Sequence, residues 1–420
     1  MKTKLSRQFI IFILFCLFFI TVLMVSFLST VLTFSQRGRM AYGLEFEGTP
    51  LTGMSREDAA ELFKTAARQK MNSHQVIWLT FEQQRWQISP QQVGLTADID
   101  ATVENAYAIG HSGRLLPDLY ADLRCALQGR SIKLMARYDD PSLQAALKAI
   151  ADQINTPATD AACTFAADGK IKKLPAVSGK NINLESLLDE CRSRLLAFSF
   201  SQPIRIHPET KAPDIGDAEL ASIDSILASY TTYFYEGGNR GQNIHIAAEA
   251  LNQNLIQPGE EFSFNSAVGG RITSAGYLDA PVIIDGKIEQ DIGGGVCQVS
   301  STLYDATLLA GLTPTERTAH FYPSAYVPAG LDATVADGQI DFSFRNDLPH
   351  LVYLITRANH GSLTIYVLGT KADLGSRTIR LETKTEGAGP TVSAWRIYSQ
   401  NGQEQEREHL HTDTYDTPPA

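Results

Sequence analysis

Residues 293–311 read GGGVCQVSSTLYDATLLAG, and this stretch decides the fold of the region around it. Gly311 is a residue type that ends helices in a left-handed conformation, and Pro314 prevents further helix. Between the glycines and Gly311, one apolar face recurs at helical spacing through Val296, Val299, Leu303, Ala306 and Ala310. The pattern therefore predicts a helix whose first turn carries Cys297.

A cysteine in the first turn of a helix is placed for chemistry. The unpaired backbone N–H groups and the helix dipole favour a thiolate there, and a free N–H could serve as an oxyanion donor. The glycines permit positive φ or the close approach of another backbone. The candidate substrate-binding residues of this stretch are Gly294, Gly295, Gln298, Ser300 and Ser301.

Cys297, His320 and Asp332 follow one another in the sequence. They are the residue types of a thiol nucleophile, its general base and the carboxylate that orients the base. A structural interpretation stands beside this catalytic one. Free cysteines often only fill space, His320 lies among aromatic residues that suit a core histidine, and Asp332 is a common turn-capping type.

Two glycine-rich basic loops are the next candidates. Arg240 and Asn243 lie in GGNRGQNIHIAAEA (237–250), and Arg271 lies in GGRITSAGY (269–277). An arginine at a helix start can bind a carboxylate or phosphate, whereas Asn243 could simply cap the helix. Either loop is predicted to line a cleft beside Cys297. No histidine or cysteine spacing indicates a metal site, and no cofactor is expected.

Composition excludes several classes of protein. The chain has 420 residues, 44% of them hydrophobic and 20% charged, which is typical of folded domains rather than disorder. The net charge of −10, without a basic stripe beyond the N-terminus, argues against nucleic acid as a partner. It also disfavours tight electrostatic adhesion to anionic wall polymers.

Residues 9–34 read FIIFILFCLFFITVLMVSFLSTVLTF and carry no charge. About 20 such residues suffice to span a bilayer. Lys2, Lys4 and Arg7 precede the run, so the N-terminus is predicted to be cytoplasmic and the bulk extracellular. The alternative is a cleaved signal peptide, but the run is long for one and no clear cleavage site follows. We therefore expect a single-pass anchor in the cell membrane.

Five cysteines are too few for a fold stapled by disulfides. Cys163 and Cys191 could pair, which their spacing does not decide, and Cys297 is expected to be free.

The exported part is predicted to be α+β throughout. Two small α+β units, 41–130 and 131–212, follow the cytoplasmic stub and anchor at 1–40, and are either diverged repeats or one compound domain. A larger mixed unit, 213–375, carries the cysteine helix packed on antiparallel strands. It is predicted to begin with a helix, AELASIDSILASYTTYF (218–234), and to contain a hairpin turning at Asp285–Gly286. Residues 376–420 are predicted as strands running into a frayed polar tail.

Five segments of the third unit are distinctive: NRGQNIHIAAEALN, IQPGEEFSFNSAVG, DIGGGVCQVSSTLYDATLLAGL, HFYPSAYVPAGLDATV and FRNDLPHLVYL. Through these segments, over about residues 222–370, the unit closely resembles the VanW family, named for an accessory protein of B-type vancomycin-resistance clusters. The resemblance implies a Gram-positive-type envelope, a wall-facing role and a link to glycopeptide resistance or wall maintenance. The family supplies no settled reaction.

The preceding region resembles the peptidoglycan-binding domain that often accompanies VanW domains and L,D-transpeptidases. The matching segments are GLEFEGTPLTGMSREDAAEL, WQISPQQVGLTADID and ENAYAIGHSG. This resemblance implies peptidoglycan or a wall precursor as ligand. Separately, the Cys–His–Asp order is similar to that of transglutaminase-like and NlpC-type cysteine enzymes, although the spacing here is tighter.

Two functional hypotheses from different classes follow. The first is a membrane-anchored protein that binds peptidoglycan, a wall precursor or an envelope protein partner. The second is a thiol enzyme in which Cys297 attacks an amide or ester of a wall peptide, with His320 as base and Asp332 as its orienter. The enzyme hypothesis requires His320 within hydrogen-bonding reach of the Cys297 sulfur.

Overall fold

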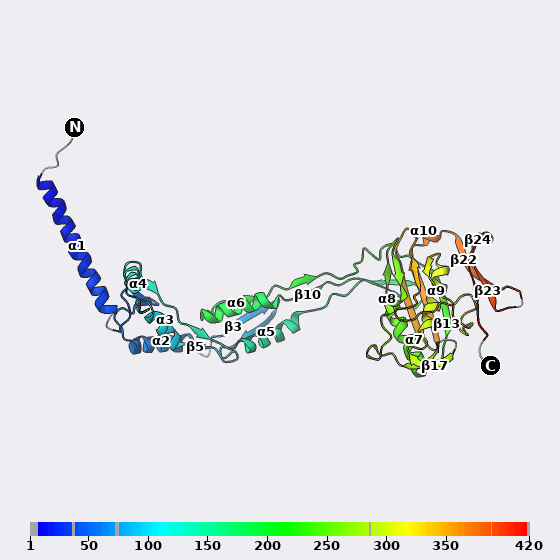
Figure 1. Ribbon diagram of the computed structural model, residues 1–420, viewed down its shortest axis with the longest axis horizontal. Helices are drawn as coiled ribbons and strands as arrows, with labels where there is room; N and C mark the ends of the chain where they lie inside the picture. Colours follow the sequence, from blue (N-terminus) through cyan, green and yellow to red (C-terminus); the bar gives the residue numbers. More distant parts are fainter. Residues whose placement is uncertain (1–6, 36–37, 72–74, 285–286, 388, 418–420) are drawn as a thin grey trace, which may run out of the picture. The chain divides into compact units, whose positions relative to one another are not determined.

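The computed structural model describes the whole chain except residues 1–6, 36–37, 72–74, 285–286, 388 and 418–420 (Figure 1). It is a mixed α+β structure with an N-terminal apolar helix and several small sheets. The chain divides into two compact units. The first comprises Met1–Pro157 and Gly179–Lys211, and the second comprises Ala158–Ser178 and Ala212–Ala420.

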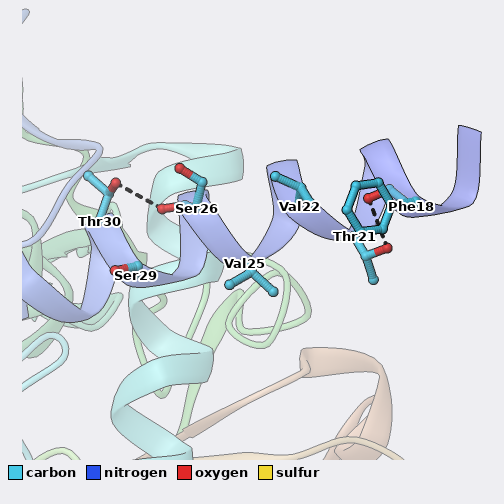
Figure 2. A pocket seen from close by; sticks show the side chains of 7 residues that line it. All are labelled: Phe18, Thr21, Val22, Val25, Ser26, Ser29 and Thr30. Atoms are coloured by element: carbon cyan, nitrogen blue, oxygen red, sulfur yellow. Dashed lines mark hydrogen bonds between the residues drawn. The ribbon is translucent and has the colours of Figure 1, made fainter. Parts of the chain in front are cut away.

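The N-terminal helix α1 (Arg7–Ser35) contains the apolar segment Phe9–Val31, which is long and apolar enough to cross a membrane. A shallow groove along one side of α1 carries several hydroxyl groups (Figure 2). The Thr30 hydroxyl donates to the Ser26 carbonyl at 2.9 Å, and the Thr21 hydroxyl donates to the Leu17 carbonyl at 2.5 Å. The Thr21 and Thr30 hydroxyls are thus satisfied within the helix.

The remaining helices of the first unit are α2 (Arg56–Lys70), α3 (Ile99–Tyr107), α4 (Leu115–Gln128), α5 (Asp140–Ile154) and α6 (Leu184–Leu196). Its strands are β1 (Leu44–Phe46), β2 (Thr49–Pro50), β3 (Ile77–Phe81), β4 (Gln84–Ile88), β5 (Thr96–Ala97), β6 (Arg130–Ser131), β7 (Ala136–Arg137), β10 (Gly179–Asn181), β11 (Ile204–Arg205) and β12 (Glu209–Lys211). Ser55 caps α2 and forms a reciprocal capping box with Asp58.

The first unit has one hydrophobic core that runs from Met40 to Ile206 in sequence. Strand β11 pairs in parallel with β3, so Ile204 lies opposite Leu79. Residues on both sides of position 130 therefore contribute to the same core. Residues 132–135 separate the short strands β6 and β7.

The second unit contains α7 (Gly238–Leu251), α8 (Phe264–Val268), a 3₁₀ turn η1 (Thr273–Ala275), α9 (Val296–Leu309) and α10 (Lys371–Leu374). Its strands are β8 (Ala162–Phe165), β9 (Ile171–Leu174), β13 (Ser225–Tyr233), β14 (Leu255–Ile256), β15 (Glu261–Ser263), β16 (Asp279–Ile284), β17 (Lys287–Ile292), β18 (Thr313–Glu316), β19 (Ser343–Arg345), β20 (Val352–Asn359), β21 (Ser362–Gly369), β22 (Arg377–Thr385), β23 (Thr391–Gln400) and β24 (Gln403–Thr414).

Helix α9 forms where the sequence predicts it and packs on an antiparallel sheet in the order β13-β21-β20-β14. Its predicted apolar face is buried, and Gly311 adopts a φ of 80° after the last turn. Polar residues on its other faces are buried as well: Gln298, Ser300, Ser301, Thr302, Asp305 and Thr307. The helix is thus a central element of the second unit, and its polar side chains must find partners inside the protein.

The helix predicted over residues 218–234 is wrong. Ser225–Tyr233 form strand β13, which pairs with β21 along its whole length apart from a bulge between Ile226 and Ala228. The segment is rich in β-branched and aromatic residues, including Thr231, Thr232 and Tyr233, which favour strands. Pairing along β21 supplies the tertiary contacts that outweigh the helical appearance of the sequence.

The frayed polar tail predicted at the C-terminus is also wrong. Residues 403–414 form strand β24, which pairs with β23 in a three-stranded antiparallel sheet. Its exposed charges form ion pairs with neighbouring strands, such as Arg407 with Glu382. The buried Arg396 of β23 donates to the Leu312 carbonyl at 2.6 Å, just beyond the C-terminal end of α9. These contacts order a segment that looks polar and disordered in the sequence.

Two hairpins form in the second unit, β8–β9 and β16–β17. The turn of the first lies at Asp168–Gly169, whereas the turn of the second, predicted at Asp285–Gly286, lies outside the described residues. All five cysteines lie in the described part of the chain, where each is a free thiol.

Candidate active site

The start of helix α9 places Cys297 in a glycine-dependent turn. Gly293 and Gly295 have φ values of 90° and 108°, which favour glycine. A Cβ on Gly294 would lie 2.7 Å from the carbonyl oxygens of both Ala280 and Pro281. The turn therefore packs its backbone directly against β16, which brings the first residues of α9 to a fixed position.

Backbone hydrogen bonds define the first turn around the thiol. The Val296 N–H donates to the Gly293 carbonyl at 3.1 Å, and the Gln298 N–H donates to the Gly295 carbonyl at 3.0 Å. The N–H of Cys297 lies between these two, at the positive end of the helix dipole. It is the candidate oxyanion donor of the site.

His320 lies between Cys297 and Asp332. Its Nδ1 is 2.6 Å from Oδ2 of Asp332, and its backbone N–H donates to the same oxygen at 2.7 Å. Its side chain also lies within hydrogen-bonding reach of the Cys297 thiol. The structure thus brings the three sequence-predicted residues together in the order that a nucleophile, a base and an orienting carboxylate require.

Electrostatics favour a charged thiolate–imidazolium pair. Burial raises the pKa of Cys297, but the hydrogen bond and charge of His320, the Val335 contact and the charge of Arg271 outweigh it and lower that pKa. Burial would lower the pKa of His320, but its hydrogen bonds to Asp332 and Cys297 raise it to about 9. The Cys297 Sγ also lies 3.4 Å from the Val335 carbonyl oxygen.

Asp332 is held as a carboxylate by several partners. Burial would raise its pKa, but the hydrogen bond and charge of His320, together with Tyr415 and Arg317, lower that pKa to about 2. The Tyr415 hydroxyl donates to Asp332 Oδ1 at 2.5 Å and accepts from the Gly330 N–H at 2.7 Å. An ion pair between Arg317 and Asp413, at 2.7 Å, connects the partners of Asp332 to strand β24.

Sequence reasoning missed Tyr326, Arg317 and Tyr415. The Tyr326 hydroxyl lies 3.4 Å from Nε2 of His320, so it contacts the ring edge that faces away from Asp332. Tyr326 is six residues from His320, and its proximity could have been suspected from that spacing alone. Tyr415 lies 83 residues from Asp332, and no local signal in the sequence points to it.

Arg240 and Arg271 both lie within electrostatic range of Cys297. Arg240 donates to Oε1 of the buried Gln298 at 2.8 Å. The Gln298 amide in turn donates to the Thr232 hydroxyl and the Tyr233 carbonyl, at 2.9 and 3.0 Å. Arg271 pairs with Asp337 and donates to Asn265 Oδ1 at 2.6 Å. Gln298 is thus occupied in orienting Arg240.

Three further candidate residues are buried, and their side chains form hydrogen bonds with backbone groups: Asn243, Ser300 and Ser301. The Asn243 amide donates to the carbonyls of Leu278 and Gly294, which fixes the glycine turn rather than capping α7. Ser300 and Ser301 donate to the Ala333 carbonyl at 2.6 and 3.3 Å, and the Ala333 N–H donates back to Ser301. They join the cysteine helix to the loop that carries Asp332.

The sequence profile described as "VanW like protein" matches residues 239–368, which include Cys297, His320 and Asp332. Residues 239–368 form a VanW-like domain. A second profile, described as "Putative peptidoglycan binding domain", matches residues 86–198. The VanW-like domain thus lies in the second unit, and most of the second match lies in the first.

Two curated proteins resemble part of this chain. "Uncharacterized protein YoaR" of Bacillus subtilis (strain 168) is 39% identical over 155 residues, or 36% of this chain and 51% of the relative. "Vancomycin B-type resistance protein VanW" of Enterococcus faecalis (strain ATCC 700802 / V583) is 37% identical over 136 residues, or 30% of this chain and 49% of the relative. The chain spans about half the length of the curated relatives it matches. No solved structure matches.

Proposed function

We propose that this protein is a cell-envelope thiol enzyme that performs acyl transfer or amide hydrolysis on wall peptides. The observation that carries the proposal is the position of His320, hydrogen-bonded to Asp332 at 2.6 Å and within hydrogen-bonding reach of the Cys297 thiol. The match to a peptidoglycan-binding profile supports a wall substrate, and the apolar helix α1 supports a location at the membrane.

The chemistry follows from the three side chains. The Cys297 thiolate adds to a peptide carbonyl, and the oxyanion that forms on the carbonyl oxygen is stabilised by the Cys297 N–H at the start of α9. The His320 imidazolium donates its proton to the leaving nitrogen as the C–N bond breaks, which leaves a thioester on Cys297. Neutral His320 then takes a proton from water or an acceptor amine, which attacks the thioester and restores the thiol.

A second candidate function is binding without catalysis. It is favoured by the match to the peptidoglycan-binding profile, which covers residues 86–198 and does not include Cys297. In that case α1 would anchor the protein, and both units would hold peptidoglycan, a wall precursor or an envelope partner. A role in glycopeptide resistance or wall maintenance is compatible with either function, because one relative is named for such resistance.

The decisive experiment exposes the full chain, in detergent, to soluble wall peptides released from peptidoglycan. We expect a Cys297-linked acyl adduct by intact mass spectrometry after acid quench, and Cys297-dependent cleavage or exchange products. Cys297→Ala should abolish both, whereas Cys16→Ala, which removes a thiol of α1, should abolish neither. Binding to peptidoglycan without an adduct or product would refute catalysis and favour the second candidate.

A further inference from the structure

We propose that Arg240 is the binding site for a free carboxylate of the substrate, so that the enzyme acts on peptides at their C-terminal residue. The inference rests on the proposed function and adds the chemical class of the substrate. It is carried by a guanidinium beside the thiol that lacks a carboxylate partner in the described chain.

Arg240 differs from comparable arginines in its partners. Among the arginines of the described residues that are at least partly shielded from solvent, it is the one without an ion pair. The others that are shielded pair with a carboxylate: Arg56, Arg192, Arg194, Arg271, Arg317 and Arg396. A partly buried charge without a partner is costly, so its retention indicates a ligand of opposite charge.

The fold holds this cation at the reacting thiol. A Cβ on Gly295 would lie 2.9 Å from Arg240 Cγ, so the arginine stem packs against the turn that begins α9. Gln298, one residue after Cys297, accepts from one guanidinium nitrogen and is itself buried and fully engaged. The guanidinium is therefore pre-oriented, and it retains further N–H donors for a carboxylate.

The charges around Cys297 can accommodate one further anion. Arg271 is neutralised by Asp337, and His320 is paired with Asp332. In the resting site Arg240 lies within electrostatic range of Cys297. As the sulfur bonds to the carbonyl carbon it loses its negative charge, so Arg240 loses that counter-charge during the attack on the amide. The α-carboxylate of a C-terminal residue lies a few bonds from the amide that precedes it, so it can occupy this position while that amide is attacked.

Alkylation of Cys297 by iodoacetate and iodoacetamide tests the site directly. Each reagent forms a bond from Sγ to carbon with loss of iodide, and the two differ in carrying a carboxylate or an amide. The ratio of their rates cancels the thiolate fraction, so a change in the thiol pKa leaves it unaltered. Rates are measured on the full chain in neutral detergent, by mass spectrometry of the peptide that contains Cys297.

In the wild type we expect the iodoacetate-to-iodoacetamide ratio to exceed that of free cysteine by about tenfold or more, the effect of one charge-assisted hydrogen bond. Arg240→Gln should return the ratio towards the free-cysteine value, and Arg240→Lys should retain part of it. Arg345→Gln, which removes an exposed arginine of β19, is the matched control and should keep the wild-type ratio.

A wild-type ratio equal to that of free cysteine, or an elevated ratio that survives Arg240→Gln, would overturn the carboxylate site. The second result would assign the effect to the other nearby cations. Neither result bears on the proposed function, which fails instead if wall peptides yield no Cys297-dependent adduct or product. The two proposals can therefore fail separately.

Discussion

Tyr415 donates a hydrogen bond of 2.5 Å to Asp332, the carboxylate that binds His320. Tyr415 follows β24, and Asp332 lies on the loop joined to the cysteine helix by Ser300 and Ser301. The C-terminal sheet and the VanW-like domain therefore meet at the candidate active site.

Tyr415→Phe should weaken both stability and positioning. The ring remains, but Asp332 Oδ1 loses a donor and the Gly330 N–H loses an acceptor in a buried place. We expect a loss of about 1–3 kcal/mol in the free energy of unfolding, measured by urea denaturation. Tyr235→Phe, at a largely exposed tyrosine, is the control and should change stability little. An unchanged stability in Tyr415→Phe would show that this bond contributes nothing.

His320→Ala should make Cys297 less reactive at neutral pH. The imidazolium lowers the pKa of the thiol, and the His320 pKa of about 9 keeps that charge present below pH 9. Without it, burial dominates and the thiol pKa rises, so the thiolate fraction at pH 7 falls about tenfold for each unit of the rise. Alkylation by iodoacetamide against pH measures this shift. Superimposable profiles for wild type and variant would contradict the charged pair.

Gly294→Ala should disrupt the turn that places the thiol. The added methyl would lie 2.7 Å from two backbone carbonyl oxygens of β16, which cannot move aside as a flexible side chain can. We expect a destabilisation of about 1–3 kcal/mol and slower alkylation of Cys297. Gly270→Ala provides the control, because its new Cβ would meet only a Ile272 methyl at 3.9 Å. Equal effects of the two substitutions would contradict the close packing.

Asp305→Asn should stabilise the protein at neutral pH. Burial raises the pKa of Asp305 well above its usual value, although the Tyr230 hydroxyl opposes that rise. The carboxyl group of Asp305 has its ordinary pKa, 3.8, in the unfolded chain. Below this pH it is protonated in both the folded and the unfolded protein, so ionisation does not reduce stability. As pH rises above this value, only the unfolded state ionises, so the wild type loses stability that the neutral asparagine keeps.

Thermal unfolding as a function of pH checks this sign. The Tm advantage of Asp305→Asn should grow from pH 4 to pH 8. Asp341→Asn, at a carboxylate hydrogen-bonded to Ser263 and Asn265, is the contrasting variant and should lower the Tm instead. A Tm advantage for Asp305→Asn that is independent of pH would show that ionisation is not its cause.

Local signals predicted the parts of the site that lie close in sequence. The glycines, the apolar spacing and Gly311 identified α9 and its first-turn cysteine. The order of Cys297, His320 and Asp332 indicated a thiol site, and the structure brings the three together. The catalytic role of these residues stays a prediction.

Partners fixed by tertiary pairing were not predictable from one sequence. Residues 225–233 look helical in isolation, and become a strand because β21 pairs with them. Gln298 was expected to bind substrate. Its side-chain amide instead forms hydrogen bonds with Thr232, Tyr233 and Arg240, which lie in other segments of the chain. Tyr415 could not be found because its bond to Asp332 joins residues 83 positions apart.

The hydroxyl of Tyr415 also affects where the C-terminal boundary should lie when fragments of related proteins are expressed. Sequence similarity to the VanW profile ends at residue 368, yet the phenol that holds Asp332 comes 47 residues later. A fragment trimmed to the region of similarity would retain the thiol, the imidazole and the carboxylate while losing a donor that holds the carboxylate. Inactivity of such a fragment would result from the loss of these strands, and it would be mistaken for evidence that the protein is not an enzyme.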